Sequence, residues 1–223
     1  MIARTHPALE AREMFRFFRS GDEETLALRG VSLEVYSGEI VAVTGPSGSG
    51  KSTLLACLSG LDEPAGGSAW VAGQRMSHRP ESERAALRSR HVGVLFQSAN
   101  LLSHLSVTGN VRLAQQIAGG PRTPVVDIID RVGLTARARA FPSQLSGGEN
   151  ARAGLAVALA NDPEVILADE PTGELDGSTE HRLLDLLRGH ADRGAAILLV
   201  THSPEVVGHA DRVVELRDGR VIS

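Results

Sequence analysis

Residues 45–53 read GPSGSGKST, and a short apolar run with β-branched residues precedes them. Within this stretch, Gly45, Gly50, Lys51 and Ser52 match the G-x-x-x-x-G-K-[ST] pattern of a phosphate-binding loop. The glycines let backbone N–H groups curve around an anion without a Cβ in the way. Lys51 would bring a full charge to the β and γ phosphates, and the Ser52 hydroxyl is placed to ligate Mg²⁺. A chance Gly/Ser-rich loop is the alternative, and the strand and helix predicted on either side disfavour it. The expected phosphate-binding residues are Gly45, Pro46, Ser47, Gly48, Ser49, Gly50, Lys51, Ser52 and Thr53.

A phosphate loop also needs a carboxylate to hold the metal, normally at the end of a neighbouring strand. The stretch VILADE supplies one, because a strand predicted over residues 165–168 is followed by Asp169 and Glu170. Asp169 would hold Mg²⁺, and Glu170 would polarise an attacking water. Two solvated carboxylates at a strand end are an ordinary alternative, so this motif alone leaves both interpretations open.

The elements that must position these residues alternate along the chain. Predicted strands cover residues 31–35, 40–43, 69–72, 92–96, 165–168, 196–200 and 213–216. Predicted helices cover residues 51–59, 81–91, 179–190 and 204–210. Residues 98–161 differ, because they show helical segments and Gly/Pro breaks without a convincing strand. This alternation predicts an α/β fold with a mainly parallel sheet covered on both faces and a helical insertion.

Composition restricts the class of protein further. At 223 residues the chain is long enough for one sizeable core and short for two independent domains. A formal net charge of −4 argues against a general nucleic-acid binder. The single cysteine, Cys57, excludes an internal disulfide. No apolar run reaches the length of a membrane span, and the first residues lack the apolar core of a secretory signal, so we expect a cytoplasmic chain.

Two further motifs identify a family. LSGGE at residues 145–149 opens an apolar helical run, and ADEPTGELD spans residues 168–176. Together with GPSGSGKST, and in the same order, these closely resemble the ATP-binding cassette (ABC) ATPases. The resemblance covers essentially the whole chain and implies a phosphate-loop NTPase fold with an antiparallel N-terminal β portion. It implies one cassette, with residues 1–96 and 162–223 as the catalytic core and residues 97–161 as the helical signature subdomain.

The resemblance also assigns roles to single residues. It makes Gln97 in LFQS the glutamine that contacts Mg²⁺ and nucleotide, and His202 in VTHS the switch histidine. It makes Asp176 the aspartate of the loop at the dimer interface. On the residues alone, Gln97 could instead be a strand-end cap and His202 a surface histidine. The catalytic residues implied are Glu170, His202 and Lys51, with ATP and Mg²⁺ as the cofactors.

One aromatic side chain should stack on adenine. Phe18 sits where the family keeps that aromatic, judged by its spacing to LRGVSLEV. It lies in the run FRFF, and Phe15 and Phe17 are the alternatives that the sequence leaves open.

The signature loop implies that a second copy is needed. Ser146, Gly147 and Gly148 precede a helix and so form a second anion cradle, about a hundred residues from the first. In the family this cradle, with Glu149, faces the γ-phosphate of ATP held by the other subunit. The resemblance therefore implies a head-to-tail dimer around two ATP molecules, opened again by hydrolysis.

The chain looks most similar to the branch that contains the LolD, MacB and FtsE ATPases, which work with membrane subunits. We expect a separate permease chain and a peripheral position on the inner face of the membrane. Coupling helices of that permease would dock near Gln97 and residues 101–111. The cargo expected is a lipid, lipoprotein, peptide or drug; the alternative is an ATPase that transports nothing and drives an extracytoplasmic enzyme or sensor.

Several positions depart from the usual motifs of that branch. Asn150 follows LSGGE where glutamine or arginine is usual, and Val157 replaces a frequent arginine. Gly109 replaces the usual glutamate before asparagine, and Glu174 replaces a small or amide residue. None removes a phosphate or metal ligand, so activity is still expected. Gly109 leaves the usual permease contact at that position open.

Overall fold

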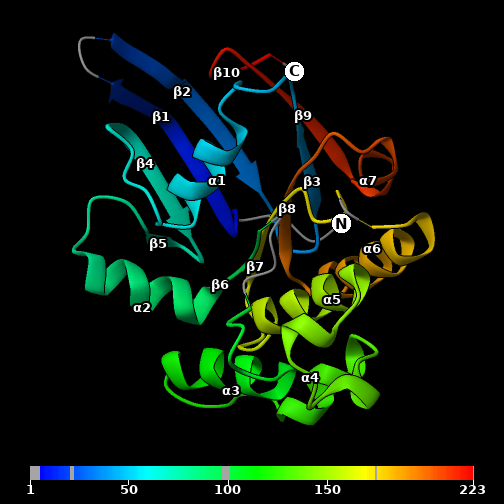
Figure 1. Ribbon diagram of the computed structural model, residues 1–223. Helices are drawn as coiled ribbons and strands as arrows, with labels where there is room; N and C mark the ends of the chain where they lie inside the picture. The colour runs from blue at the N-terminus through cyan, green and yellow to red at the C-terminus, as the bar shows by residue number, and fades with distance from the viewer. Residues whose placement is uncertain (1–5, 21–22, 97–100, 174, 223) are drawn as a thin grey trace.

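The computed structural model describes residues 6–20, 23–96, 101–173 and 175–222. Its elements form a large sheet, a smaller antiparallel sheet beside it, and helices that cover the large sheet (Figure 1). The predicted α/β architecture with an antiparallel N-terminal portion is therefore confirmed. No helix in these ranges combines the length and the apolar character that crossing a membrane would need.

The large sheet, as far as the structure describes it, has six strands in the order β10-β9-β3-β8-β7-β6. Strands β9 to β6 run parallel, and β10 is antiparallel to β9. Their bounds are Ile40–Thr44 for β3, Val92–Leu95 for β6, Val165–Asp169 for β7, Ala196–Val200 for β8, Arg212–Arg217 for β9 and Arg220–Val221 for β10. The central strands are continuous apolar runs because helices and the second sheet bury both of their faces.

Register within this sheet aligns three strand ends. Val43 of β3 pairs with Val200 of β8, and Val200 pairs with Asp169 of β7. The loops that follow these strands therefore leave the same edge of the sheet side by side. In open α/β sheets this carboxyl edge is where ligands bind.

The smaller sheet has the order β2-β1-β4-β5, with β1 at Leu9–Ser20, β2 at Glu23–Val35, β4 at Gly66–Val71 and β5 at Gln74–Arg75. Strand β1 is absent from the predicted elements. Its inward residues are Leu9, Ala11 and Met14, so the two-residue alternation breaks after Ala11. A register shift lies there, and Glu13 has a φ of 45°. Such an irregularity hides a strand from a pattern that requires strict alternation.

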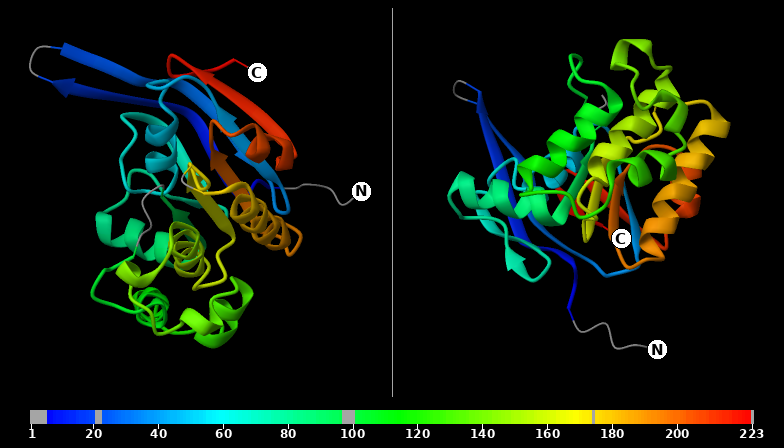
Figure 2. Two further views of the ribbon diagram at one scale, coloured as in Figure 1. Left: turned by 45° about the vertical axis from the view of Figure 1, so that its right-hand side comes forward. Right: turned by 90° about the horizontal axis from the view of Figure 1, so that it is seen from below.

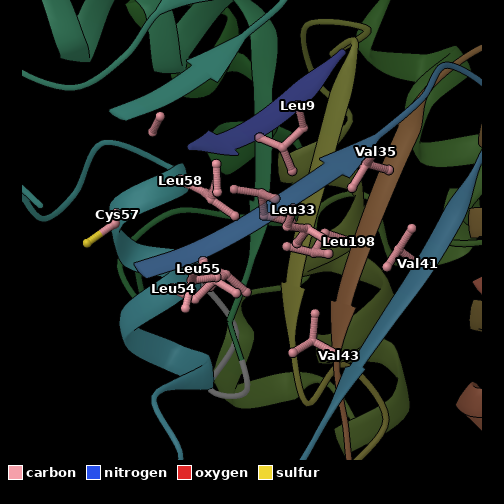
Figure 3. Packing of buried hydrophobic residues seen from close by; sticks show 14 of the residues in the cluster. Leu9, Leu33, Val35, Val41, Val43, Leu54, Leu55, Cys57, Leu58 and Leu198 are labelled. Atoms are coloured by element: carbon pink, nitrogen blue, oxygen red, sulfur yellow. The ribbon is translucent and has the colours of Figure 1, made fainter. Parts of the chain in front are cut away.

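Helix α1, Lys51–Leu58, lies between the two sheets. Its Leu54, Leu55 and Leu58 are at most 1% exposed and belong to one core with Leu33 of β2 and Leu198 of β8 (Figure 3). Both sheets therefore fix the helix that follows the phosphate loop.

Five of the other described helices contribute to the core on the other face of the large sheet, and Leu87 of the sixth packs against the core that contains α1. Their bounds are Glu81–His91 for α2, Val107–Ile117 for α3, Val125–Arg131 for α4, Gly147–Ala158 for α5, Gly177–Ala191 for α6 and Pro204–His209 for α7. Short 3₁₀ turns occupy Thr135–Arg137 and Pro142–Gln144. As predicted, residues 101–161 contain helices and no strand. Figure 2 shows α3, α4 and α5 grouped together, away from the β1–β2 hairpin.

Candidate active site

The phosphate loop is a tight curve between β3 and α1 that two positions can make only with glycine. Gly45 and Gly50 have φ values of 142° and 103°. A Cβ on Gly45 would lie 2.0 Å from the carbonyl oxygen of Leu216, and one on Gly50 would lie 2.4 Å from that of Ala27. The glycines of the pattern therefore shape this loop and are not an accident of composition.

The end of α1 at this loop has donors without partners. Gly50 is its N-cap and provides no side-chain cap, and the first turn carries no acidic residue. Within the residues that the structure describes, the N–H groups of Gly48, Gly50 and Lys51 donate no hydrogen bond. Unpaired N–H groups and the helix dipole together favour an anion at this place.

Lys51 is the only lysine among the 23 basic residues of the chain. It is 7% exposed, and its Nζ donates to the carbonyl oxygens of Gly45 at 2.8 Å and Pro46 at 2.9 Å. Burial lowers the pKa of this ammonium, while the carboxylates of Glu170 and Asp169 oppose the shift. An ammonium has three donors, so one N–H remains for a further acceptor. A compact point charge suits this narrow loop better than the wide fork of an arginine.

Glu170 follows β7 with strained backbone geometry. Its φ of 46° is in the left-handed region, and its N–H donates to the carbonyl of Val200 at 2.9 Å. Its Oε2 accepts from Thr201 Oγ1 at 3.4 Å and from the N–H of His202 at 3.3 Å. Its Oε1 is buried without a hydrogen bond in the described part of the chain and lies 3.5 Å from Nε2 of His202. Two donors hold Oε2, whereas Oε1 is an unpaired acceptor buried beside His202 at the wall of the cleft.

These parts open into one cleft of about 540 Å³. Its lining residues are Phe18, Ala27, Ser47, Gly48, Gly50, Lys51, Ser52, Thr53, Asp169, Glu170, Gly173, Val200 and His202. The cleft unites predicted residues that are up to 184 positions apart, from Phe18 to His202 (202 − 18). The aligned ends of β3, β8 and β7 explain why they meet.

Of the three candidate aromatics, Phe18 alone lines this cleft. Exposure does not separate them, because Phe15, Phe17 and Phe18 are 41%, 43% and 44% exposed. The ring of Phe15 instead packs over Gly30, where an added Cβ would lie 3.1 Å from its Cζ. The geometry therefore favours Phe18 as the stacking residue.

The signature loop lies at the start of α5, outside the cleft of its own chain. Ser146 is the N-cap, and its Oγ accepts from the N–H of Glu149 at 3.2 Å. In return, Glu149 Oε2 accepts from the N–H of Ser146 at 2.9 Å, and Oε1 accepts from Arg137 Nε at 3.0 Å. The hydrogen bond from Ser146 is the main cause of a lowered pKa at Glu149. In the described structure the N–H groups of Gly147 and Gly148 donate no hydrogen bond.

One other predicted residue, Asp176, lies apart from the cleft lining. Asp176 is the N-cap of α6, and it accepts from the N–H groups of Ser178 and Thr179 at 3.0 Å. Hydrogen bonds to Ser178 and Thr179 lower the pKa of Asp176 to about 2. Gln97 lies outside the described residues, as does Glu174.

The cleft fits a nucleoside triphosphate with Mg²⁺. Unpaired amides and Lys51 suit the phosphates, and the exposed Ser52 and the half-buried Asp169 offer oxygen ligands. Among the described side chains, no group of three His, Cys, Asp or Glu residues could hold a metal. A metal ion here would therefore take ligands from the phosphates as well, as Mg²⁺ commonly does.

The prediction and the cleft differ at several positions. Gly45, Pro46 and Ser49 were expected to bind phosphate and do not line the cleft. Ala27 and Gly173 line it without having been predicted, because neither residue type signals chemistry in a sequence. Val200 could have been found, because it ends the strand that leads into VTHS.

Comparisons with known proteins agree with this geometry. The family model described as "ABC transporter" matches residues 28–173. "Macrolide export ATP-binding/permease protein MacB" of Escherichia coli (strain K12) is 42% identical over 97% of this chain and 34% of MacB. The MacB of Shigella flexneri gives the same identity and coverage. The chain thus spans about a third of the length of the curated relatives it matches.

Solved structures extend the similarity to the whole fold. The dimeric structure of MJ0796, described as a bacterial ABC transporter cassette, has a TM-score of 0.90 and 32% identity, covering 96% of this chain and 97% of that one. A post-hydrolysis state of the same cassette bound to ADP and Pi has a TM-score of 0.89 at the same identity and coverage. The family predicted from GPSGSGKST, LSGGE and ADEPTGELD is confirmed. This chain belongs to the ABC transporter family, as an ATPase cassette.

Proposed function

We propose that this chain binds ATP with Mg²⁺ in the cleft at the N-terminal end of α1 and hydrolyses it as one half of a head-to-tail dimer. The convergence of Lys51, Asp169 and Glu170 in one cleft carries this proposal. The loop amides and Lys51 bind the phosphates, and Phe18 stacks on the adenine. Ser52, Asp169 and Gln97 would hold Mg²⁺, which would neutralise part of the phosphate charge.

Hydrolysis follows from the arrangement around Glu170. Its carboxylate orients a water molecule for attack on the γ-phosphorus and accepts a proton from that water. The water oxygen forms a bond to phosphorus as the bond from phosphorus to the ADP oxygen breaks. His202, whose Nε2 lies 3.5 Å from Oε1, then donates toward the γ-phosphate, where charge accumulates.

The second copy supplies the rest of the site. Ser146, Gly147 and Gly148 lie outside the cleft of their own chain, and their two glycine amides face no internal acceptor among the described residues. We assign them, with Glu149 and Asp176, to the γ-phosphate side of the other copy's ATP. The dimeric form of the similar cassette MJ0796 supports this assignment.

Closure and opening of the dimer would drive a membrane permease. We assign residues 97–161 to a helical signature subdomain that contacts the permease through Gln97 and residues 101–111, and residues 1–96 with 162–223 to the catalytic core. The N–H of Gly109 donates to Oγ of Ser106, the N-cap of α3, at 3.2 Å. This hydrogen bond of a capping box is therefore kept, although Gly109 has no side chain to make the reciprocal one. The name of MacB joins an ATP-binding part to a permease, which supports such a partner.

The proposed cargo is a lipid, lipoprotein, peptide or drug that is exported or released, with the cassette on the inner face of the membrane. If the partner is a separate chain, deletion of its gene should move this protein from the membrane fraction to the soluble fraction.

Glu170→Gln tests the catalytic assignment. The substitution keeps the size of the side chain and removes its charge, so turnover should fall by about 10²–10⁴-fold. ATP binding should persist because Lys51 and Asp169 are unchanged, and less repulsion of the triphosphate should lengthen the life of the closed dimer. ATPase rates and size-exclusion chromatography with ATP and Mg²⁺ measure both effects. The control is Glu83→Gln, an exposed glutamate on α2 that should change neither. A near wild-type rate in Glu170→Gln would make Glu170 a bystander.

A further inference from the structure

One face of the Phe18 ring is covered by a guanidinium group. Cζ of Arg16 lies over this ring, 4.8 Å from its centroid. Arg16 does not line the cleft, whereas Phe18 does. Because Phe18 is still 44% exposed, the ring keeps open surface on its cleft side. A base that stacks there would meet a ring already bound to a cation.

The guanidinium itself is fixed by two parallel hydrogen bonds. Arg16 Nε donates to Asp62 Oδ2 and Nη2 donates to Oδ1, each at 2.8 Å. The side chains of Arg16 and Asp62 are 25% and 27% exposed. Such bidentate pairs fix the plane of the guanidinium as well as its position. Arg16 therefore holds one orientation over the ring.

Asp62 is attached in turn to α1. Its N–H donates to the carbonyl of Ala56 in α1 at 3.1 Å, and its Oδ1 also accepts from the N–H of Glu63 at 2.8 Å. The same helix begins at the phosphate loop. A continuous series of contacts thus joins α1, Asp62, Arg16 and Phe18.

We propose that Arg16 is a positioning residue for the nucleotide base. Clamped by Asp62, it fixes the Phe18 ring at a set place relative to the phosphate loop, so that base and phosphates are bound by one preorganised unit. A ring that is ordered beforehand loses less conformational freedom when the base stacks on it. The cation–π contact supplies the attraction that orders it. This inference rests on the proposed function, because it takes Phe18 as the surface on which adenine stacks.

The chain contains a matched pair that lacks any link to the cleft. Arg12, on the same strand, makes two hydrogen bonds to Glu10, and its Cζ lies 4.9 Å from the centroid of the Trp70 ring. Its chemistry is that of Arg16, but neither Arg12 nor Trp70 lines the cleft. Arg12→Ala is therefore the control for Arg16→Ala.

The test separates base from phosphate binding. The dissociation constants of ATP and of inorganic tripolyphosphate, both with Mg²⁺, are measured on the full chain by competition with a fluorescent nucleotide. Arg16→Ala should weaken ATP about three- to tenfold and leave tripolyphosphate unchanged. Phe18→Ala should weaken ATP at least as much. Arg12→Ala should change neither constant.

Asp62→Asn keeps the shape of the clamp, so it tests the same point if Arg16→Ala folds poorly. It should give a smaller loss of ATP affinity, and combining it with Arg16→Ala should add little to the loss from Arg16→Ala alone. Unchanged ATP affinity in both variants, or equal losses for ATP and tripolyphosphate, would overturn the positioning role. If wild-type protein bound neither ligand, the proposed function itself would fail. If Phe18→Ala bound ATP normally, another surface would hold the base and the inference would fail alone.

Discussion

Two helix starts in this molecule are both assigned to phosphate, and they are built differently. Helix α1 begins after Gly50, with no capping side chain and no acidic residue in its first turn. Helix α5 begins after Ser146, with a reciprocal capping box that Glu149 completes. The first therefore presents bare amides beside a lysine, and the second presents two glycine amides beside a carboxylate.

The difference indicates that the two helix starts have different functions. At α1 a bound anion would satisfy the helix end, so we expect a single chain to have affinity for phosphate. At α5 the side chains already satisfy part of the helix end, and a negative charge stands nearby. That end should bind phosphate weakly alone and contribute when another copy's ATP is brought to it. We expect changes at α1 to affect nucleotide binding and changes at α5 to affect hydrolysis.

Among changes at the two helix starts, Ser146→Arg should have the largest effect on turnover. A long charged side chain at the start of α5 would block the approach of the other copy's phosphates, because Ser146 is exposed and lies at the helix end. Hydrolysis should fall by at least about 10²-fold, as for loss of a group that stabilises transition-state charge. Nucleotide binding to the single chain should stay within about twofold.

Steady-state ATPase rates and nucleotide titration of the Ser146→Arg protein provide the check. Ser82→Arg, on the exposed face of α2, adds the same side chain away from both helix starts and should be neutral. Retained turnover in Ser146→Arg would show that α5 takes no part in the reaction.

Lys51→Ala tests the start of α1 and should weaken nucleotide binding. It removes the one ammonium of the loop, whose Nζ lies 2.8 Å from the carbonyl of Gly45. A hydrogen bond to a charged group is worth about 1.5–3 kcal/mol, so ATP affinity should fall by about 10- to 100-fold. Calorimetric titration measures the loss, with Arg79→Ala, just before α2, as a charge-removing control. Near wild-type affinity in a folded Lys51→Ala protein would end the interpretation of residues 45–53 as a phosphate loop.

Glu149→Gln should have the smallest effect, and it should depend on pH. The pKa of Glu149 in the folded chain is below its ordinary value of 4.5, mainly through the N–H of Ser146. The contribution of its charge to stability is therefore complete above the unfolded pKa and is lost as the pH falls through the lower folded pKa. Wild type should melt above Glu149→Gln at about pH 6, and this gap should narrow toward about pH 3.

Thermal melts across that pH range, with Glu83→Gln as the exposed control, test this prediction. A gap between wild type and Glu149→Gln that widens in acid would show that the charged form of Glu149 contributes nothing to the cap.

The sequence predicted most of the parallel sheet because its strands are short apolar runs between clear helices. Buried strands such as Val165–Asp169 and Ala196–Val200 matched to within one residue. Strand β1 was missed because an irregularity near Glu13 breaks its alternation. Helix α6 starts two residues before the predicted residue 179 because Asp176 caps it.

The site was predictable where its chemistry depends on residue types at fixed spacing. Glycine, lysine and carboxylate spacing identifies the loop and the strand end, since this chemistry depends on residue type. Which aromatic reaches the cleft depends on how β1 pairs across its irregularities, so the sequence left three candidates. The clamp between Arg16 and Asp62 joins residues 46 positions apart, and no local pattern marks it.

In the proposed dimer, each working site takes its α1 from one chain and its α5 from another. Mixing Lys51→Ala protein with Ser146→Arg protein tests this claim most directly. At ATP concentrations near the wild-type KM, each variant alone should have little activity, because Lys51→Ala binds ATP weakly and Ser146→Arg blocks the start of α5 at every site. In a mixed dimer, one site combines both changes, and the other combines an intact Lys51 with an intact Ser146.

ATPase activity is measured for each variant alone and for equal mixtures after exchange of subunits, with wild type as reference. Mixing should restore activity, up to about a quarter of the wild-type rate if subunits pair at random and each intact site works. A mixture as inactive as its two components, when cross-linking shows that mixed dimers have formed with ATP, would contradict the shared site.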